Sequence, residues 1–300
     1  MKKPDVAIIY NFNDKLAHLG GSSFGIKGEI GYVAQFLISV SSIKENWNSD
    51  LFTYKFYVIH SEPFGESVRQ KIENTGATLI HIDYKSPTYL RTFCFTERIE
   101  CDYRLVLDND TFGLSTPNFD FTKDILAGFG GCRYNKNTSD DLCNVLSLKK
   151  PNTAPISKSP TMNWNGNEYR KYYDGVEYGD IFPYFNCGAL LIKNSLSLEF
   201  GNLLRQSVNM ANNWAIKHNH KIWLQDFYGL CINHITNNWG VFETGFNFII
   251  NPNIPDIRYV MNNYKGNTSL IHYINCMSET PYGKLIKQQR NKLNDTINTA

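Results

Sequence analysis

The stretch RLVLDNDTFG, residues 104–113, is the part of the sequence that decides the fold. Its apolar run at 105–107 is typical of a buried strand. The run ends in Asp108, Asn109 and Asp110, so two carboxylates stand at the carboxyl end of that strand. In extended geometry alternate side chains share a face, which lets Asp108 and Asp110 share one divalent cation. The alternative is a polar turn, since Asp and Asn are favoured turn residues.

Three later segments place polar residues beside apolar strands or helices. YFNCGALLIKN at 184–194 has Asn and a small Cys-Gly pair before an apolar strand, WLQDFYGL at 223–230 carries one acid, and LIHYI at 270–274 contains a strand that ends with His. In this order and spacing the four segments resemble GT-A glycosyltransferases, most closely the family 8 type. There a D-x-D follows a strand, an F-N-S-G-like segment lies under the donor sugar, a D-Q-like segment follows, and a late H-F or H-Y supplies a metal-ligand His. The resemblance covers most of the chain, from about Val6 to Lys287.

The resemblance implies a metal-dependent glycosyltransferase that moves a sugar from a nucleotide-sugar donor, such as a UDP-sugar, to a hydroxyl of a glycan or another acceptor, with retention. It implies that Asp108, Asp110 and His272 are the metal ligands and that the cofactor is Mn²⁺ or Mg²⁺. The donor-binding candidates are Tyr10, Asn11, Arg91, Asp108, Asn109, Asp110, Gly188 and Lys284. The catalytic candidates are Asp226 and Asn186.

Several of these residues have a plain structural alternative. Tyr10 ends the first strand, at the edge where ligands bind in open α/β sheets, but it also suits packing at the sheet end. Arg91 suits a surface pair with an acid such as Glu97, and a histidine such as His272 is commonly a core residue. Lys284 belongs to a run of basic residues at helical spacing that is typical of a solvated face.

The sugar-side candidates rest on residue chemistry as well as on the resemblance. The amide of Asn186 can bond sugar hydroxyls, and Gly188 lets a ring lie close to the backbone. Asp226 is expected near the start of a helix, where an acid also serves simply as a cap or dipole partner. The family 8 likeness implies retention, whereas an inverting reaction needs a base, for which Asp226 is the candidate.

Composition narrows the class of protein. The 300 residues are 42% hydrophobic and 19% charged with a formal net charge of +2, so a single α/β domain is expected and nucleic acid is disfavoured as the partner. The seven cysteines include no C-x-x-C pair and fit reduced thiols, which indicates the cytoplasm. The apolar segment Val6–Ile9 is too short for a signal-peptide core, and no run approaches the ~18 apolar residues of a membrane span.

Strands and helices alternate along the first half of the chain. Strands are expected at 6–10, 52–60, 78–82 and 105–107, and helices at 29–42, 67–75 and 89–100. Such alternation predicts a mostly parallel sheet with helices on both faces. Further strands are expected at 125–132, 182–192, 246–250 and 269–274, and helices at 197–217 and 224–232.

The periodic pattern is lost between residues 133 and 180. This stretch is rich in Asn, Pro and Gly but also in Trp and Tyr, too aromatic for ordinary disorder. Aromatic faces with hydrogen-bonding neighbours suit sugar rings, so an insertion or lid on the acceptor side is expected; a small structural subdomain is the alternative.

Two other classes of protein share some of these features. A phosphatase of the haloacid dehalogenase type also has a D-x-D after a strand, but its motif belongs to an N-terminal strand and is followed two residues later by Thr or Val, where Phe112 stands here. A catalytically inert carbohydrate-binding protein on the same fold is the second alternative, because fold does not fix function.

Overall fold

The computed structural model describes residues 2–11, 32–48, 50–61, 64–83, 87–150, 181–217, 225–242, 246, 248–249, 269–272 and 281–298. Its strands are β1 (Asp5–Asn11), β2 (Thr53–His60), β3 (Thr78–His81), β4 (Tyr103–Leu107), β5 (Thr111–Gly113), β6 (Ile125–Asn135), β7 (Ile181–Lys193), β8 (Trp239–Val241), β9 (Phe248–Ile249) and β10 (Leu270–His272). Its helices are α2 (Tyr32–Asn46), α3 (Glu66–Glu73), α4 (Pro87–Thr96), α5 (Lys136–Leu146), α7 (Asn194–Lys217), α8 (Gln225–Ile235) and α10 (Pro281–Asn298).

The described strands form two sheets. The larger has the order β3-β2-β1-β4-β7-β6-β8, in which β7 runs antiparallel to both neighbours and the other pairs are parallel. The smaller has the order β5-β10-β9. The mostly parallel α/β architecture expected from the alternating strands and helices is confirmed. Because β1, β2 and β4 are parallel neighbours, their carboxyl ends meet at one edge, where the acidic triplet begins.

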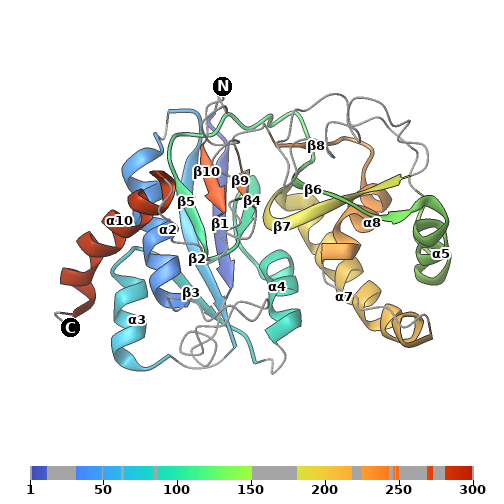
Figure 1. Ribbon diagram of the computed structural model, residues 1–300, viewed down its shortest axis with the longest axis horizontal. Coiled ribbons are helices and arrows are strands. Elements are labelled where there is room, and N and C mark those ends of the chain that lie inside the picture. The colour runs from blue at the N-terminus through green and yellow to red at the C-terminus, as the bar shows by residue number, and fades with distance from the viewer. Residues whose placement is uncertain are drawn as a thin grey trace.

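Helices cover both faces of the larger sheet (Figure 1), with α2, α3 and α10 on one side and α4, α5, α7 and α8 on the other. The alternation of side chains along β1 explains why: Val6, Ile8 and Tyr10 join the core beneath α2, while Ala7 and Ile9 join the core beneath α4 and α7. β1 is therefore apolar on both faces, and the polar residues follow at its carboxyl end.

Two of the sequence-based expectations differ from the structure, and a third falls outside the described residues. The helix predicted at 89–100 ends at Thr96, because the Arg104 guanidinium donates to the carbonyl oxygens of Cys94 (2.9 Å) and Glu97 (2.6 Å) and so terminates it. The stretch predicted to be irregular from 133 begins with the end of β6 and with α5. Residues 151–180, the rest of the expected insertion, lie outside the described residues.

Cysteines 94, 101, 143, 187 and 231 carry free thiols. Burial raises the pKa of the Cys187 thiol to about 12, so this thiol stays neutral at physiological pH. Across the described ranges no helix combines the length and the apolar character that crossing a bilayer requires. The cytoplasmic location inferred from the cysteines stays a prediction.

A close contact between α4 and α7 gives a test of the packing. A Cβ atom on Gly201 of α7 would lie 2.6 Å from Thr96 Cγ2 and 2.8 Å from Phe95 Cβ, both on α4. We expect Gly201→Ala to lower the free energy of unfolding by about 1–3 kcal/mol, because the two helices must separate to admit the methyl group. Chemical denaturation measures the change. The control is Asn202→Ala, at an exposed position of the same helix, with a change within about 0.5 kcal/mol. Equal stability of Gly201→Ala and the wild type would contradict the packing described.

Candidate metal centre

The acidic triplet is fixed by bonds on both sides of the turn after β4. The backbone N–H of Asp108 donates to the carbonyl oxygen of Gly188 (2.9 Å), and the Thr111 hydroxyl donates to the carbonyl oxygen of Asp108 (3.0 Å). Immediately after the triplet the chain enters β5, which pairs antiparallel with β10 so that Thr111 lies opposite His272. This register places a residue from the end of the chain beside Asp110.

Three side chains converge there. His272 Nε2 lies 3.2 Å from Asp110 Oδ1 and 3.5 Å from Asp108 Oδ2, and one ligand atom of each residue lies within 4.8 Å of the other two. The side chains are 7%, 16% and 27% exposed for His272, Asp110 and Asp108. Atoms bound to one divalent ion at about 2.0–2.6 Å are at most about 5 Å apart, so this donor set fits a single cation. Carboxylate oxygens and an imidazole nitrogen are donor types that divalent metal ions accept.

The electrostatics favour positive charge at this point. Burial lowers the pKa of His272, but Asp110 and then Asp108 raise it by more, so the pKa lies above its ordinary value. When His272 is protonated, its Nε2 proton stands where a cation would bind, and that proton has to leave before the nitrogen can coordinate. The other ring nitrogen, Nδ1, is buried and has no hydrogen-bond partner among the described residues.

Arg91 lies directly behind the centre. Its Nη1 is 2.5 Å from Asp108 Oδ1 and 3.4 Å from Asn11 Oδ1, its Nη2 donates to the Cys187 carbonyl oxygen, and its Nε donates to the Tyr228 hydroxyl (3.0 Å). Burial opposes the charge of this guanidinium, but the opposing effects of Asp108 first, and then of Tyr228, Cys187 and Cys94, together outweigh burial, so the pKa of Arg91 is raised. The alternative of a surface pair with Glu97 is wrong, because Arg91 is 7% exposed and its carboxylate partner is Asp108.

The carbonyl oxygens that accept from Arg91 and from the Asp108 N–H both lie in an irregular part of β7. Ala127 pairs with Leu190, but the next residue of β6, Gly128, pairs with Asn186. The three residues between them on β7 have no partner on β6 and form a bulge, and the carbonyl oxygens of Cys187 and Gly188 within it accept from Arg91 and from Asp108. The sequence analysis did not predict this bulge, although a glycine within a strand, here Gly188, is a feature that often marks one.

The structure brings together Asn11, Arg91, Asp108, Asn109, Asp110, Gly188 and His272 of the predicted site residues. The Asn109 amide is buried, with Nδ2 donating to the Asn11 carbonyl oxygen (3.4 Å), and Asn109 Oδ1 has no partner in the described part of the chain. Whether these residues bind a donor stays a prediction.

Four predicted residues are placed differently or incompletely. Tyr10 is fully buried, with its hydroxyl 2.7 Å from the Ser39 hydroxyl and its ring against Phe36, which is the packing role weighed in the sequence analysis. Lys284 is exposed on α10, and no hydrogen bond or ion pair among the described residues joins it to the centre. The backbone of Asn186 lies in β7 and that of Asp226 in the first turn of α8, but their side chains lie outside the described residues. The donor and catalytic roles of all four stay predictions.

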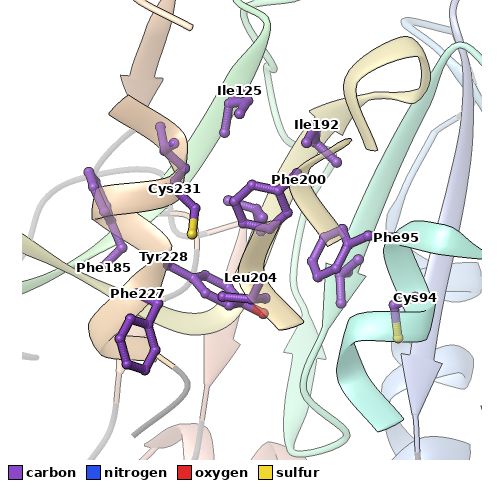
Figure 2. Close-up of a cluster of buried hydrophobic side chains, with 14 of the residues drawn as sticks. Cys94, Phe95, Ile125, Phe185, Ile192, Phe200, Leu204, Phe227, Tyr228 and Cys231 are labelled. Atoms are coloured by element: carbon purple, nitrogen blue, oxygen red, sulfur yellow. The ribbon is translucent and has the colours of Figure 1, made fainter. Parts of the chain in front are cut away.

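Tyr228 is the contact that sequence analysis missed. It stands two residues after Asp226 in α8 and is fully buried, and its ring belongs to the apolar cluster with Phe95 and Phe200 (Figure 2). Its aromatic side chain is indistinguishable in sequence from any core residue. Only its three-dimensional position shows that its hydroxyl accepts a hydrogen bond from the buried guanidinium of Arg91.

The fold is similar to that of solved glycosyltransferases. The galactosyltransferase LgtC in complex with donor and acceptor sugar analogs shares 13% identity at a TM-score of 0.53, and an active-site mutant of LgtC shares 14% at 0.53, each match covering 95% of both chains. The glycosyltransferase GlyE of Streptococcus pneumoniae TIGR4 shares 14% at a TM-score of 0.51 over 96% of this chain and 61% of that one. No protein-family model matches the sequence, and no curated protein matches it significantly. At these identities the likeness shows the fold, and that fold is GT-A, as the resemblance in the sequence predicts.

Proposed function

We propose that the chain is a metal-dependent glycosyltransferase that moves a sugar from a nucleotide-sugar donor, most simply a UDP-sugar, to a hydroxyl of a glycan or another acceptor, with retention. The observation that carries the proposal is the convergence of Asp108, Asp110 and His272 at the carboxyl edge of a GT-A sheet. Ligands of open α/β sheets bind outside this edge. A site that is both acidic and cation-compatible suits a diphosphate, which binds through the cation and not through the carboxylates themselves.

Asp108, Asp110 and His272 would hold Mn²⁺, or Mg²⁺ with more water in its shell. When bound, the cation neutralises the negative charge that grows on the nucleoside diphosphate as the bond from sugar C1 to phosphate breaks. The protein supplies orientation: the Asp108 carboxylate is held by Arg91 on one oxygen and faces His272 with the other. This arrangement fixes the ligand atoms before the donor arrives.

The remaining roles follow the sequence-based assignment. Asn109 of the triplet and Asn11, to which its amide donates, would meet the nucleoside, and the fully buried Tyr10 would support this end of β1 from within the core. Arg91 and Lys284 would contribute positive charge near the diphosphate, Arg91 through Asp108 and Lys284 from α10. Asn186 and Gly188 would lie against the donor sugar, and Asp226 would act beside the bond that breaks.

The acceptor is proposed to bind over the stretch from 133 to 180. A sugar presents alternating apolar faces and hydroxyls, and the Trp, Tyr and Asn residues of this stretch match both kinds of surface.

The geometry weighs against the phosphatase alternative. That chemistry needs Asp108 as a nucleophile with a carboxylate oxygen open to the phosphorus atom. Asp108 Oδ1 is instead 2.5 Å from Arg91 Nη1, and Oδ2 faces His272 at 3.5 Å. The triplet also follows β4, the strand beside β1, and not the N-terminal strand. A catalytically inert carbohydrate-binding protein would have the same site residues. Only a measurement of turnover distinguishes it from the proposed enzyme.

Turnover is tested by incubating the protein with a panel of nucleotide sugars and Mn²⁺, with and without glycan acceptors, and following release of free nucleoside diphosphate. We expect release with one nucleotide class, faster with an acceptor and abolished by EDTA. Release of inorganic phosphate from unrelated phosphate esters would favour the phosphatase. Binding of a glycan without any release from the whole panel would favour the inert binder.

His272→Ala gives a graded test of the proposed cation site. We expect it to weaken Mn²⁺ binding by about tenfold, and less than Asp110→Ala does. The reason is that loss of a neutral imidazole takes away a donor atom but no negative charge. Mn²⁺ titration followed by electron paramagnetic resonance (EPR) measures both variants. A larger loss for His272→Ala than for Asp110→Ala would show that His272 is the anchoring ligand and reverse the ranking.

A further inference from the structure

The hydroxyl of the buried Tyr228 makes one hydrogen bond to the part of the chain that the structure describes. Its ring packs against Phe200 (centroids 5.6 Å apart) and Phe95 (6.3 Å). Figure 2 shows the three rings together, Tyr228 on α8, Phe200 on α7 and Phe95 on α4. Within this apolar cluster its hydroxyl accepts a hydrogen bond from Arg91 Nε at 3.0 Å. A phenylalanine would pack equally well in the same space, so packing alone does not explain the hydroxyl.

The guanidinium that Tyr228 contacts is held on every nitrogen. Nη1 meets Asp108 and Asn11, Nη2 meets the Cys187 carbonyl oxygen, and Nε meets Tyr228. Because the guanidinium is planar and rigid, fixing Nε and Nη2 fixes the direction of Nη1. That direction decides which oxygen of Asp108 is occupied by Arg91 and which faces His272.

We propose that Tyr228 is a positioning residue for the Asp108 carboxylate and acts through Arg91. The inference rests on the proposed function, since it assigns to Asp108 a cation that the site would bind. The hydroxyl keeps the plane of Arg91 aligned, Arg91 keeps Oδ1 of Asp108, and Oδ2 stays turned toward Asp110 and His272. Residues behind a metal ligand commonly set its affinity in this way.

The same bond also links two parts of the site. Tyr228 belongs to α8, the helix that carries Asp226, whereas Asp108 follows β4. The path Asp108–Arg91–Tyr228 therefore ties the cation side of the site to the helix assigned to the sugar side. Loss of the hydroxyl leaves Arg91 Nε–H, in the described part of the chain, without its acceptor in a buried place. The guanidinium then turns to find another acceptor, because an unsatisfied buried donor is costly.

The test compares Tyr228→Phe with Tyr103→Phe. Tyr103 is also buried and its hydroxyl donates to the Phe121 carbonyl oxygen (2.6 Å), but it lies at the opposite end of β4. Mn²⁺ affinity is measured by EPR on folded protein well below the melting temperature of each variant. We expect Tyr228→Phe to weaken Mn²⁺ binding by about three- to tenfold and Tyr103→Phe to leave it unchanged.

A double-mutant cycle tests the path itself. If Tyr228 acts through Arg91, adding Tyr228→Phe to Arg91→Met changes the Mn²⁺ affinity no further. An unchanged affinity in Tyr228→Phe, an equal loss in Tyr103→Phe, or a full additional loss in the double variant would each overturn the inference. Failure of the proposed function is seen separately, as absence of Mn²⁺ binding by the wild-type protein before any variant is compared, and the inference then falls with it.

Discussion

Asp110→Ala is expected to abolish cation-dependent binding of the donor while the fold stays intact. Asp108 shares its charge with Arg91, so Asp110 supplies much of the negative charge that faces the ion. Its removal takes away a ligand atom and a full charge from a largely buried centre, for which we expect a loss of about a hundredfold or more in Mn²⁺ affinity. The variant is measured by Mn²⁺ titration and by calorimetric titration of UDP at a fixed Mn²⁺ concentration.

The control for this prediction is Asp50→Ala. Asp50 is 76% exposed near the start of β2, at the opposite edge of the sheet, where it pairs loosely with Lys3 at 3.9 Å and accepts from the exposed Asn48 Nδ2 at 2.5 Å. Both variants should keep the circular-dichroism spectrum and the cooperative melting of the wild type. Equal UDP affinity in Asp110→Ala and in the wild type at saturating Mn²⁺ would rule out the proposed cation clamp.

Asp226→Asn is expected to lower turnover by roughly a hundredfold or more, the scale of a lost acid–base or transition-state contact. Affinity for the nucleoside diphosphate should barely change, because the diphosphate is held by the cation and by basic residues while Asp226 is proposed to act on the sugar. The substitution keeps the size of the side chain and removes only its charge. Turnover, UDP affinity and melting temperature are all measured on one preparation.

The pattern of these three measurements separates the possible roles of Asp226. A structural aspartate at the start of α8 would lower the melting temperature and spare the rate per folded molecule. An acid that acts on the sugar or the acceptor lowers the rate and spares the melting temperature. Unchanged turnover would remove Asp226 from the proposed mechanism, whatever happens to stability.

Much of the fold was predictable because its signals are local. β1 to β4 are short apolar runs with turn residues between them, and the resulting alternation of strands and helices fixes a mostly parallel sheet. The acidic triplet was found for the same reason, as an abrupt change from apolar to charged residues at a strand end. His272 was found only through the order of the motifs, since nothing local distinguishes it from a core histidine.

The rest depends on contacts between distant parts of the chain. β5 has three residues, too few for a periodic pattern, yet its pairing with β10 is what carries His272 to Asp110. The role of Arg91 depends on meeting Tyr228, 137 positions later, inside a core. For Tyr10 the sequence left packing and nucleotide contact open, and its position among Phe36, Ser39 and the rest of the core follows from how α2 lies on β1.

The central claim is that a divalent cation held by Asp108, Asp110 and His272 binds together with a nucleoside diphosphate. The most direct test is to measure Mn²⁺ affinity with and without UDP, and UDP affinity with and without Mn²⁺, on the wild-type protein. Linked binding at one site requires that each ligand raises the affinity of the other by the same factor. We predict such reciprocal enhancement, about tenfold or more, and its loss in Asp110→Ala. Independent binding of Mn²⁺ and UDP to the wild-type protein would contradict the account.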